Sequence, residues 1–209
     1  MGLVGVDHLV FACPDLGEGI RHVEGLLGVE VRPGGRHEGL GTRNVLVGLG
    51  EGVYLEVIGP DPEQPDPPEP RWFRVDELSA PQLVTWAASG ADLPALAAKA
   101  RAVGVDLGRT STGGRVRPDG TELRWRVTDP GADRSGGVIP FFIDWGSTPH
   151  PSVGLPKACK LIGMTLRHPA PRGVETRLRA LDIQLKVEAG PEPAVTARLE
   201  TPTGVVELA

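Results

Sequence analysis

Two short apolar stretches of this sequence each carry one side chain that could do chemistry. His8 stands within the stretch Leu3–Phe11, and Glu56 stands beside Tyr54 within Val53–Ile58. If both stretches are strands, the alternation of side chains places the imidazole and the carboxylate on faces with apolar neighbours. Such groups are unfavourable to bury unless they are paired or bound to a ligand. The two residues indicate a metal site, a metal-free polar anchor or an inert buried pair.

The elements that position these residues form a repeating pattern. Helical spacing of apolar residues ending at Gly28 predicts the first helix, and Asp92 is a natural N-cap for the second. The first two sets of predicted strands and helices are Leu3–Phe11, Asp15–Leu27, Val29–His37, Thr42–Leu49, Val53–Ile58, Gln82–Ala88, Asp92–Val103, Leu107–Arg115, Glu122–Thr128 and Val138–Trp145. The third set is Lys160–Arg167, Gly173–Leu181, Asp182–Glu188, Ala194–Thr201 and Gly204–Leu208.

This repetition defines the predicted fold, because one such unit cannot bury its sheet alone. We predict an α+β protein in which residues 1–59 and 71–149 are βαβββ modules that pair their sheets around a cleft. Residues 60–70 read PDPEQPDPPEP and predict a semi-rigid, extended linker between them. Residues 150–209 read as a third, degenerate module that packs on the outside of the pair or forms a homodimer contact.

The repeat also suggests where a second set of site residues would lie. Aligning the helix starts Asp15 and Asp92 places Thr85 opposite His8, and a slip of one residue places Trp86 there instead. Neither residue is a good metal ligand. We include both as candidate pocket residues.

Three stretches carry a resemblance to a known family: VDHLVFACPDL, HEGLGTRNVLVGLGEGVYLEVIGPDP and VIPFFIDWG. They resemble the vicinal oxygen chelate superfamily, which has the glyoxalase and extradiol dioxygenase fold, and more narrowly its glyoxalase-like domain branch. The resemblance implies two units with paired sheets. It also implies a divalent metal held by residues from the first and last strand of each unit.

Carried over to this sequence, the resemblance implies His8 and Glu56 as metal ligands, with Glu56 also shuttling a proton. Their counterpart on the closing strand of the second unit is Asp144 in one alignment and Ile143 in another. A set of His8, Glu56 and Asp144 suits Zn, Mn, Fe(II) or Ni with open positions. If no metal is bound, we expect no cofactor.

Further residues are expected to line the cleft. His37 and Asn44 match a HxGxGTxN stretch of the same branch, and Tyr54 shares the face of Glu56. Trp86 and Trp145 are either core residues or an aromatic wall for a substrate.

The amino-acid composition speaks against nucleic acid and membranes as partners. The 209 residues carry 22 Lys and Arg against 27 Asp and Glu, so the net charge is -5 without clustered cations, which speaks against nucleic acid. No apolar run is long enough to span a membrane, and the first residues lack the cationic region of a signal peptide. With two unpaired cysteines, these features predict a cytoplasmic protein with a small-molecule ligand.

Three functions remain open from the sequence. The first is a metal-dependent lyase, isomerase or dioxygenase of unassigned substrate, although the four-ligand set of glyoxalase I itself is absent. The second is a metal-free protein that binds and sequesters a small molecule, and the third is a scaffold whose site has decayed. No P-loop, GxSxG elbow or GxGxxG between strand and helix points to other chemistry.

Overall fold

The computed structural model describes residues 5–116, 120 and 122–209. The large sheet contains β1 (Val6–Ala12), β2 (Arg32–His37), β3 (Thr42–Gly48), β4 (Tyr54–Pro60), β5 (Gln82–Ser89), β6 (Ser111–Val116), β7 (Glu122–Val127) and β8 (Phe141–Asp144). The small sheet contains β9 (Lys160–His168), β10 (Val187–Ala189), β11 (Ala194–Thr201) and β12 (Gly204–Leu208). The helices are α1 (Leu16–Leu27), α2 (Leu93–Ala102), α3 (Pro171–Ala180) and the 3-10 element η1 (Trp72–Glu77).

The predicted order of strands and helices is confirmed, but several strands begin later than expected. The strands β6 and β8 start at Ser111 and Phe141, after the apolar residues Leu107, Val138 and Ile139. Those three side chains are buried in the core although they belong to no strand. An apolar run predicts burial, and here burial extends beyond the hydrogen-bonded ladder.

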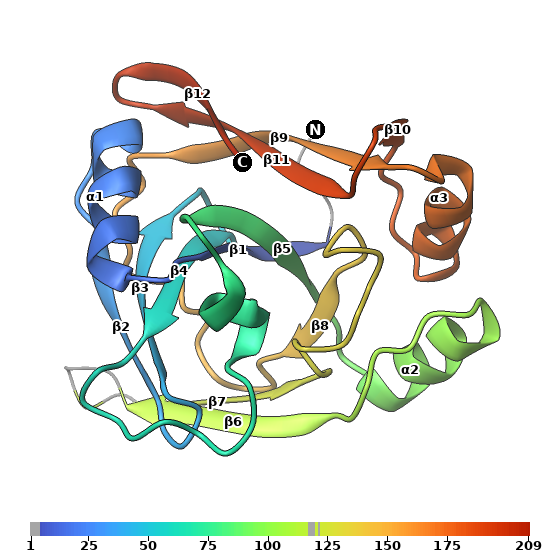
Figure 1. Cartoon of the computed structure of the whole chain (residues 1–209), viewed down its shortest axis with the longest axis horizontal. Coiled ribbons are helices and arrows are strands. Elements are labelled where there is room, and N and C mark those ends of the chain that lie inside the picture. Colours follow the sequence, from blue (N-terminus) through green and yellow to red (C-terminus); the bar gives the residue numbers. More distant parts are fainter. Residues whose placement is uncertain (1–4, 117–119, 121) are drawn as a thin grey trace.

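The large sheet has the strand order β2-β3-β4-β1-β5-β8-β7-β6. The central strands β1 and β5 are antiparallel and join two similar halves, in which β1 pairs with β4 and β5 with β8 in parallel. The sheet curls into a near-barrel whose two end strands, β2 and β6, approach one another (Figure 1). The predicted pairing of two βαβββ sheets around a hollow is confirmed.

The hollow is partly filled by apolar side chains. Val10, Ile58 and Phe141 from the strands form a core cluster with Phe73 and Val75 of η1. Figure 1 shows η1 lying across the opening of the ring of strands. The short segment after the Pro-rich stretch therefore closes one end of the near-barrel.

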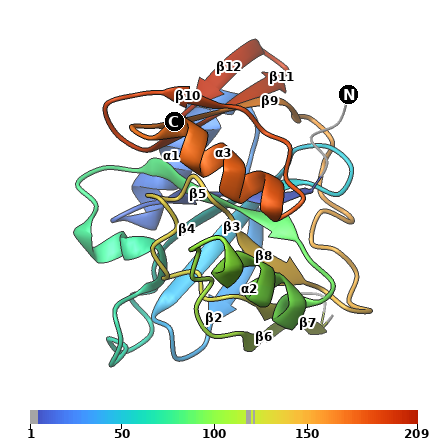
Figure 2. The same cartoon turned by 90° about the vertical axis from the view of Figure 1, so that its right-hand side faces the viewer.

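The small sheet packs on the outside of the large one. Leu9 and Trp86 of the central strands share one core cluster with Leu166, Val174 and Leu199 of the third unit. Figure 2 shows the small sheet and α3 on one side of the large sheet. The division of the chain into units remains a prediction, and no helix among the described residues is long and apolar enough to cross a bilayer.

The Pro-rich segment is attached to the first unit more closely than an extended linker would be. Asp61 is 1% exposed and its carboxylate lies 3.2 Å from Arg36 Nε. Gln64 donates to Asp61 and to the carbonyl oxygen of Thr42 on β3. Proline removes backbone donors, but the acidic and amide side chains between the prolines anchor the segment.

The loop before β8 is held by a buried arginine. Arg134 is 3% exposed and donates to the carbonyl oxygens of Asp129, Pro130 and Ala132. Its guanidinium also lies 5.7 Å from the ring centre of Phe141. Burial lowers its pKa to about 10, with the charges of nearby aspartates opposing the shift.

Replacing this arginine should destabilise the fold. We expect Arg134→Met to lower the free energy of unfolding by about 3 kcal/mol, because three buried carbonyl oxygens lose a charged donor. Denaturant unfolding of both proteins measures the change. Arg101→Met, at an exposed position on α2, is the matched control, and equal losses in the two variants would contradict the assignment.

Candidate functional site

A small inner cavity of about 40 Å³ lies inside the near-barrel. It is lined by His8, His37, Asn44, Tyr54, Glu56, Trp72, Phe73, Arg115, Trp125, Val127, Pro130, Phe141, Ile143 and Trp145. The polar side chains come mainly from the first unit, and the second unit supplies mostly aromatic and aliphatic walls. Six of the nine residues that the sequence suggested for the site are therefore brought together.

The side chains of Asp7 and His8 form a buried pair on β1. Nδ1 of His8 lies 2.8 Å from Oδ1 of Asp7, and because a carboxylate only accepts, Nδ1 carries the proton. Ser89 and Trp145 also donate to Asp7, and Nε2 of His150 lies 3.3 Å from it. Burial would raise the pKa of Asp7, but the hydrogen bonds of His150 and His8 hold it well below its ordinary value. Asp7 is thus a carboxylate that orients the imidazole of His8.

A second network fixes Glu56. The backbone N–H of Gly35 donates to Oδ1 of Asn44 at 2.9 Å, so the amide nitrogen of Asn44 points to Oε1 of Glu56 and to Nε2 of His37. Because that nitrogen only donates, Nε2 of His37 accepts and Nδ1 donates to Thr42 Oγ1. Burial lowers the pKa of His37, against the opposing charge of Glu56. His37 is therefore a neutral ring.

Glu56 and His8 are neighbours on adjacent strands, and both line the inner cavity. Oε2 of Glu56 lies 3.7 Å from Nε2 of His8, which is too long for a direct hydrogen bond. The ring of His8 is stacked on Tyr54, with centroids 4.7 Å apart, and meets the edge of Phe141 at 5.5 Å. A carboxylate oxygen and an imidazole nitrogen, each held by a separate partner, therefore lie side by side on the wall of the cavity and can both contact one small group bound there.

Three predicted site residues lie elsewhere. Asp144 forms an ion pair with Arg126, whose hydrogen bond lowers its pKa, and it does not line the inner cavity. Thr85 and Trp86 are buried in β5 and donate to carbonyl oxygens of the segment before β8. The structure does not bring these three to His8 and Glu56.

The register of the sheet explains why Thr85 does not line the inner cavity beside His8. In the first unit β4 places Tyr54 beside His8, and in the second β8 places Phe141 beside Ala87. His8 and Ala87 also lie directly opposite one another across the central pair. Ala87, and not Thr85, is the counterpart of His8, because the helix starts do not keep the register of the strands.

The same register decides between the two alignments of the closing strand. Two residues beyond Tyr54 and Phe141 stand Glu56 and Ile143, so Ile143 is the counterpart of Glu56. Asp144 follows one residue later and points to the opposite face of β8. The second unit therefore places apolar residues where the first places its imidazole and carboxylate.

Sequence reasoning missed Arg115, Trp72 and Trp125, all of which line the inner cavity. A repeated sequence motif could have identified Arg115. The triplet Gly-Gly-Arg occurs at 34–36 and again at 113–115, on the two strands that end the sheet. No comparable pattern marks the two tryptophans.

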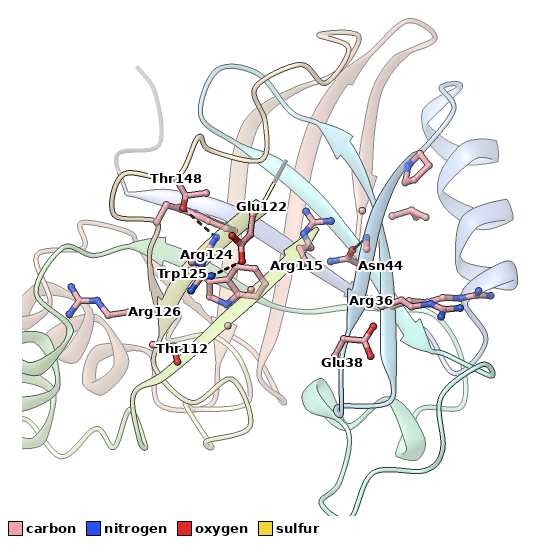
Figure 3. A pocket seen from close by; sticks show the side chains of 18 of the residues that line it. Arg36, Glu38, Asn44, Thr112, Arg115, Glu122, Arg124, Trp125, Arg126 and Thr148 are labelled. Carbon is pink, nitrogen blue, oxygen red and sulfur yellow. Dashed lines mark hydrogen bonds and ion pairs between the residues drawn. The ribbon is translucent and has the colours of Figure 1, made fainter. Parts of the chain in front are cut away.

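An outer groove of about 1270 Å³ lies over the gap between β2 and β6 (Figure 3). Asn44, Arg115, Trp125 and Trp145 line both this groove and the inner cavity, so the two meet there. The charged residues that line the groove are Arg36, Arg43, Arg115, Arg124, Arg126, Glu38, Glu122 and Asp144. Most of these arginines are paired with carboxylates. Arg36 and Arg43 pair with Asp61 and Glu63, Arg124 with Glu122, and Arg126 with Asp144.

These features agree with what comparison with known proteins shows. Residues 6–181 match the sequence model of a family described as a glyoxalase-like domain. The chain belongs to the glyoxalase-like domain family. The predicted resemblance to the vicinal oxygen chelate superfamily is confirmed by this match. No curated protein matches the sequence of this glyoxalase-like protein.

Solved structures with similarity to this chain include three with low sequence identity. A hypothetical protein from Staphylococcus aureus is 14% identical, with 90% of this chain and 87% of that chain covered and a TM-score of 0.65. Methylmalonyl-CoA epimerase from Mycobacterium tuberculosis is 19% identical, with coverages of 70% and 91% and a TM-score of 0.42. A mutant of 4-hydroxymandelate synthase from Streptomyces coelicolor is 15% identical, with coverages of 100% and 63% and a TM-score of 0.49.

The divalent metal implied by the resemblance does not fit the residues of this glyoxalase-like protein. Asp144 is turned away, and the amide of Asn44 already lies between the acceptor atoms of His37 and Glu56. Among the described residues, no group of three His, Cys, Asp or Glu side chains is arranged to hold a metal ion. Only His8 and Glu56 remain of the predicted ligand set.

Neutralising Asp7 should reveal its part in stability. We expect Asp7→Asn to lower the free energy of unfolding by about 3 kcal/mol at pH 7, because the buried imidazoles lose a carboxylate partner. The lowered pKa of Asp7 stabilises the fold above its unfolded value of about 4, and this stabilisation is lost as the pH falls further. The difference between variant and wild type should therefore shrink below pH 4.

Denaturant unfolding at several pH values measures this difference. Asp182→Asn is the matched control, since Asp182 is exposed and pairs only with the exposed Lys99 among the described residues. A difference between wild type and Asp7→Asn that stays constant from pH 7 to pH 3 would contradict the assignment.

Proposed function

We propose that this glyoxalase-like protein is an enzyme that transfers a proton at a carbon next to a carbonyl group of a small molecule. The observation that carries the proposal is that Glu56 Oε2 and His8 Nε2 lie 3.7 Å apart and that both side chains line one inner cavity. Lyases and isomerases both use such a step. Membership in the glyoxalase-like family supports an active site inside the near-barrel.

The chain's own residues supply the step. Glu56 accepts the proton as the C–H bond of the substrate breaks, and the electron pair of that bond moves toward the carbonyl oxygen to give an enolate. Return of the proton to the same carbon or a neighbouring atom completes an isomerisation. His8, held by Asp7, lies beside Glu56 and can donate or accept a second proton.

The surroundings favour a carboxylate that works as a base. Asn44 holds one oxygen of Glu56 and leaves the other directed at the cavity. Trp72, Phe73 and Phe141 form apolar walls of a cavity with room for few water molecules, so charge on the carboxylate is less screened than in bulk water. These features increase the reactivity of the exposed oxygen toward a bound C–H group.

The test is exchange of substrate hydrogen for deuterium. A panel of 2-oxo acids, neutral ketones, 2-hydroxyaldehydes and acyl thioesters is incubated with the protein in D₂O and followed by proton NMR. We expect exchange next to the carbonyl group of at least one class, and about a 10³-fold slower rate for Glu56→Gln. Exchange at the uncatalysed rate for every class would overturn the proposal.

The third unit offers the control. Glu207 on β12 resembles Glu56 in the sequence pattern of the closing strand, but it is exposed and lies outside the inner cavity, so Glu207→Gln should exchange like the wild type. A protein that only sequesters its ligand, as the sequence also allowed, would bind members of the panel without exchanging their hydrogen.

A metal measurement tests whether the proposed reaction uses the side chains alone, without a bound metal. Because Asn44 occupies the acceptor atoms of His37 and Glu56, we expect no stoichiometric Mn, Fe, Ni or Zn in the purified wild type. Asn44→Ala frees those atoms beside His8 and should bind Zn more tightly than the wild type by at least about tenfold. A stoichiometric wild-type metal that is lost in Glu56→Gln would restore the metal-dependent reading.

A further inference from the structure

We propose that the substrate is a carboxylate and that Arg115 holds its carboxylate group where the inner cavity meets the outer groove. This inference rests on the proposed proton transfer, since that reaction fixes which end of the substrate enters. It assigns a substrate class and a specificity-determining residue.

Arg115 stands at the entrance to the site. It lies on β6, is 8% exposed, and lines both the inner cavity and the outer groove. Figure 3 shows it close to Asn44 in the gap between β6 and β2. A Cβ atom at Gly35 would lie 2.9 Å from Cδ of Arg115, so the glycine on β2 leaves room for the stem of this arginine.

The charge of Arg115 acts inside the cavity. It is the one Lys or Arg among the described residues that line the inner cavity. Burial lowers the pKa of His37, the charge of Glu56 opposes this shift, and the positive charge of Arg115 adds to it, so Arg115 is within electrostatic reach of His37. A guanidinium between aromatic walls binds a carboxylate through two parallel hydrogen bonds more strongly than it would in water.

The volumes of the inner cavity and the outer groove indicate which part of a substrate each of them can hold. A cavity of about 40 Å³ accommodates about three water-sized atoms, since one such atom needs about 10 to 15 Å³ by the same measure. That is enough for a reacting carbon and part of its carbonyl group. The groove of about 1270 Å³ has room for the remainder of the molecule.

The arrangement also assists the chemistry. Removing a proton next to the carbonyl group of a molecule that already carries a carboxylate places a second negative charge on it. A guanidinium paired with the carboxylate cancels the first charge, so Glu56 has to generate only one. Arg115 would therefore determine both which molecules bind and which of them react.

Binding of malonate tests the proposal without any turnover. Trp72, Trp125 and Trp145 line the inner cavity, so tryptophan fluorescence reports on its occupation. We expect malonate to bind the wild type, and Arg115→Gln to bind it about 100-fold more weakly. Arg115→Lys should recover part of the affinity, and Arg101→Gln on the exposed face of α2 should bind like the wild type.

Neutral and phosphate probes sharpen the assignment. Malonamide has the same shape without charge and should bind at least 100-fold more weakly than malonate to the wild type. Inorganic phosphate should also bind more weakly than malonate. Malonamide or phosphate binding as tightly as malonate would overturn the carboxylate assignment, and this comparison needs no variant to fold.

The two proposals can fail separately. If malonate binding depends on Arg115 but no carboxylate exchanges its hydrogen, the carboxylate site stands and the proton transfer fails. If neutral ketones exchange through Glu56 as fast as 2-oxo acids, and Arg115→Gln leaves both rates unchanged, the proton transfer stands and the carboxylate site is wrong. Equal malonate affinity in wild type and a folded Arg115→Gln variant would overturn the inference in either case.

Discussion

The structure is organised around two ionisable side chains buried in the central strand. Every residue of β1 is buried, and two of the seven are Asp7 and His8. A carboxylate and an imidazole at that depth are tolerated only if their hydrogen bonds are complete. The partners of Asp7 come from three further places in the chain: β5, the end of β8, and the loop that leads to the third unit. The central strand thus ties the two halves and the third unit to one set of hydrogen bonds.

The two halves of the near-barrel have different tasks although they share a topology. The first half supplies His8, which Asp7 orients, and the hydrogen-bonded set of His37, Asn44 and Glu56. The second half places apolar residues at the corresponding positions and contributes aromatic walls and Arg115. A site built in this way has one polar side and one apolar side, which is typical of pockets that orient a small molecule by a few polar contacts.

Much of this could be predicted from the sequence, and the failures share a cause. The alternation of apolar residues identified the strands, and an imidazole and a carboxylate among those residues identified His8 and Glu56. The counterparts in the second half could not be identified, because the repeat has different loop lengths before and after its helix. An alignment on the helix starts therefore selects Thr85 where the strands select Ala87. Asp144 shows the same limit, since an error of one residue in a strand moves a side chain to the other face.

The gap between β2 and β6 gives the near-barrel a seam. Each of these strands is paired on one side only, and within the described part of the chain no ladder joins them. Separating the two edges therefore breaks no hydrogen bond of the sheet, whereas opening the barrel anywhere else would break several. The route to Glu56 passes through the part of the wall that can move aside at the lowest energetic cost. A rigid scaffold and an accessible interior are compatible here because the sheet stops one ladder short of closure.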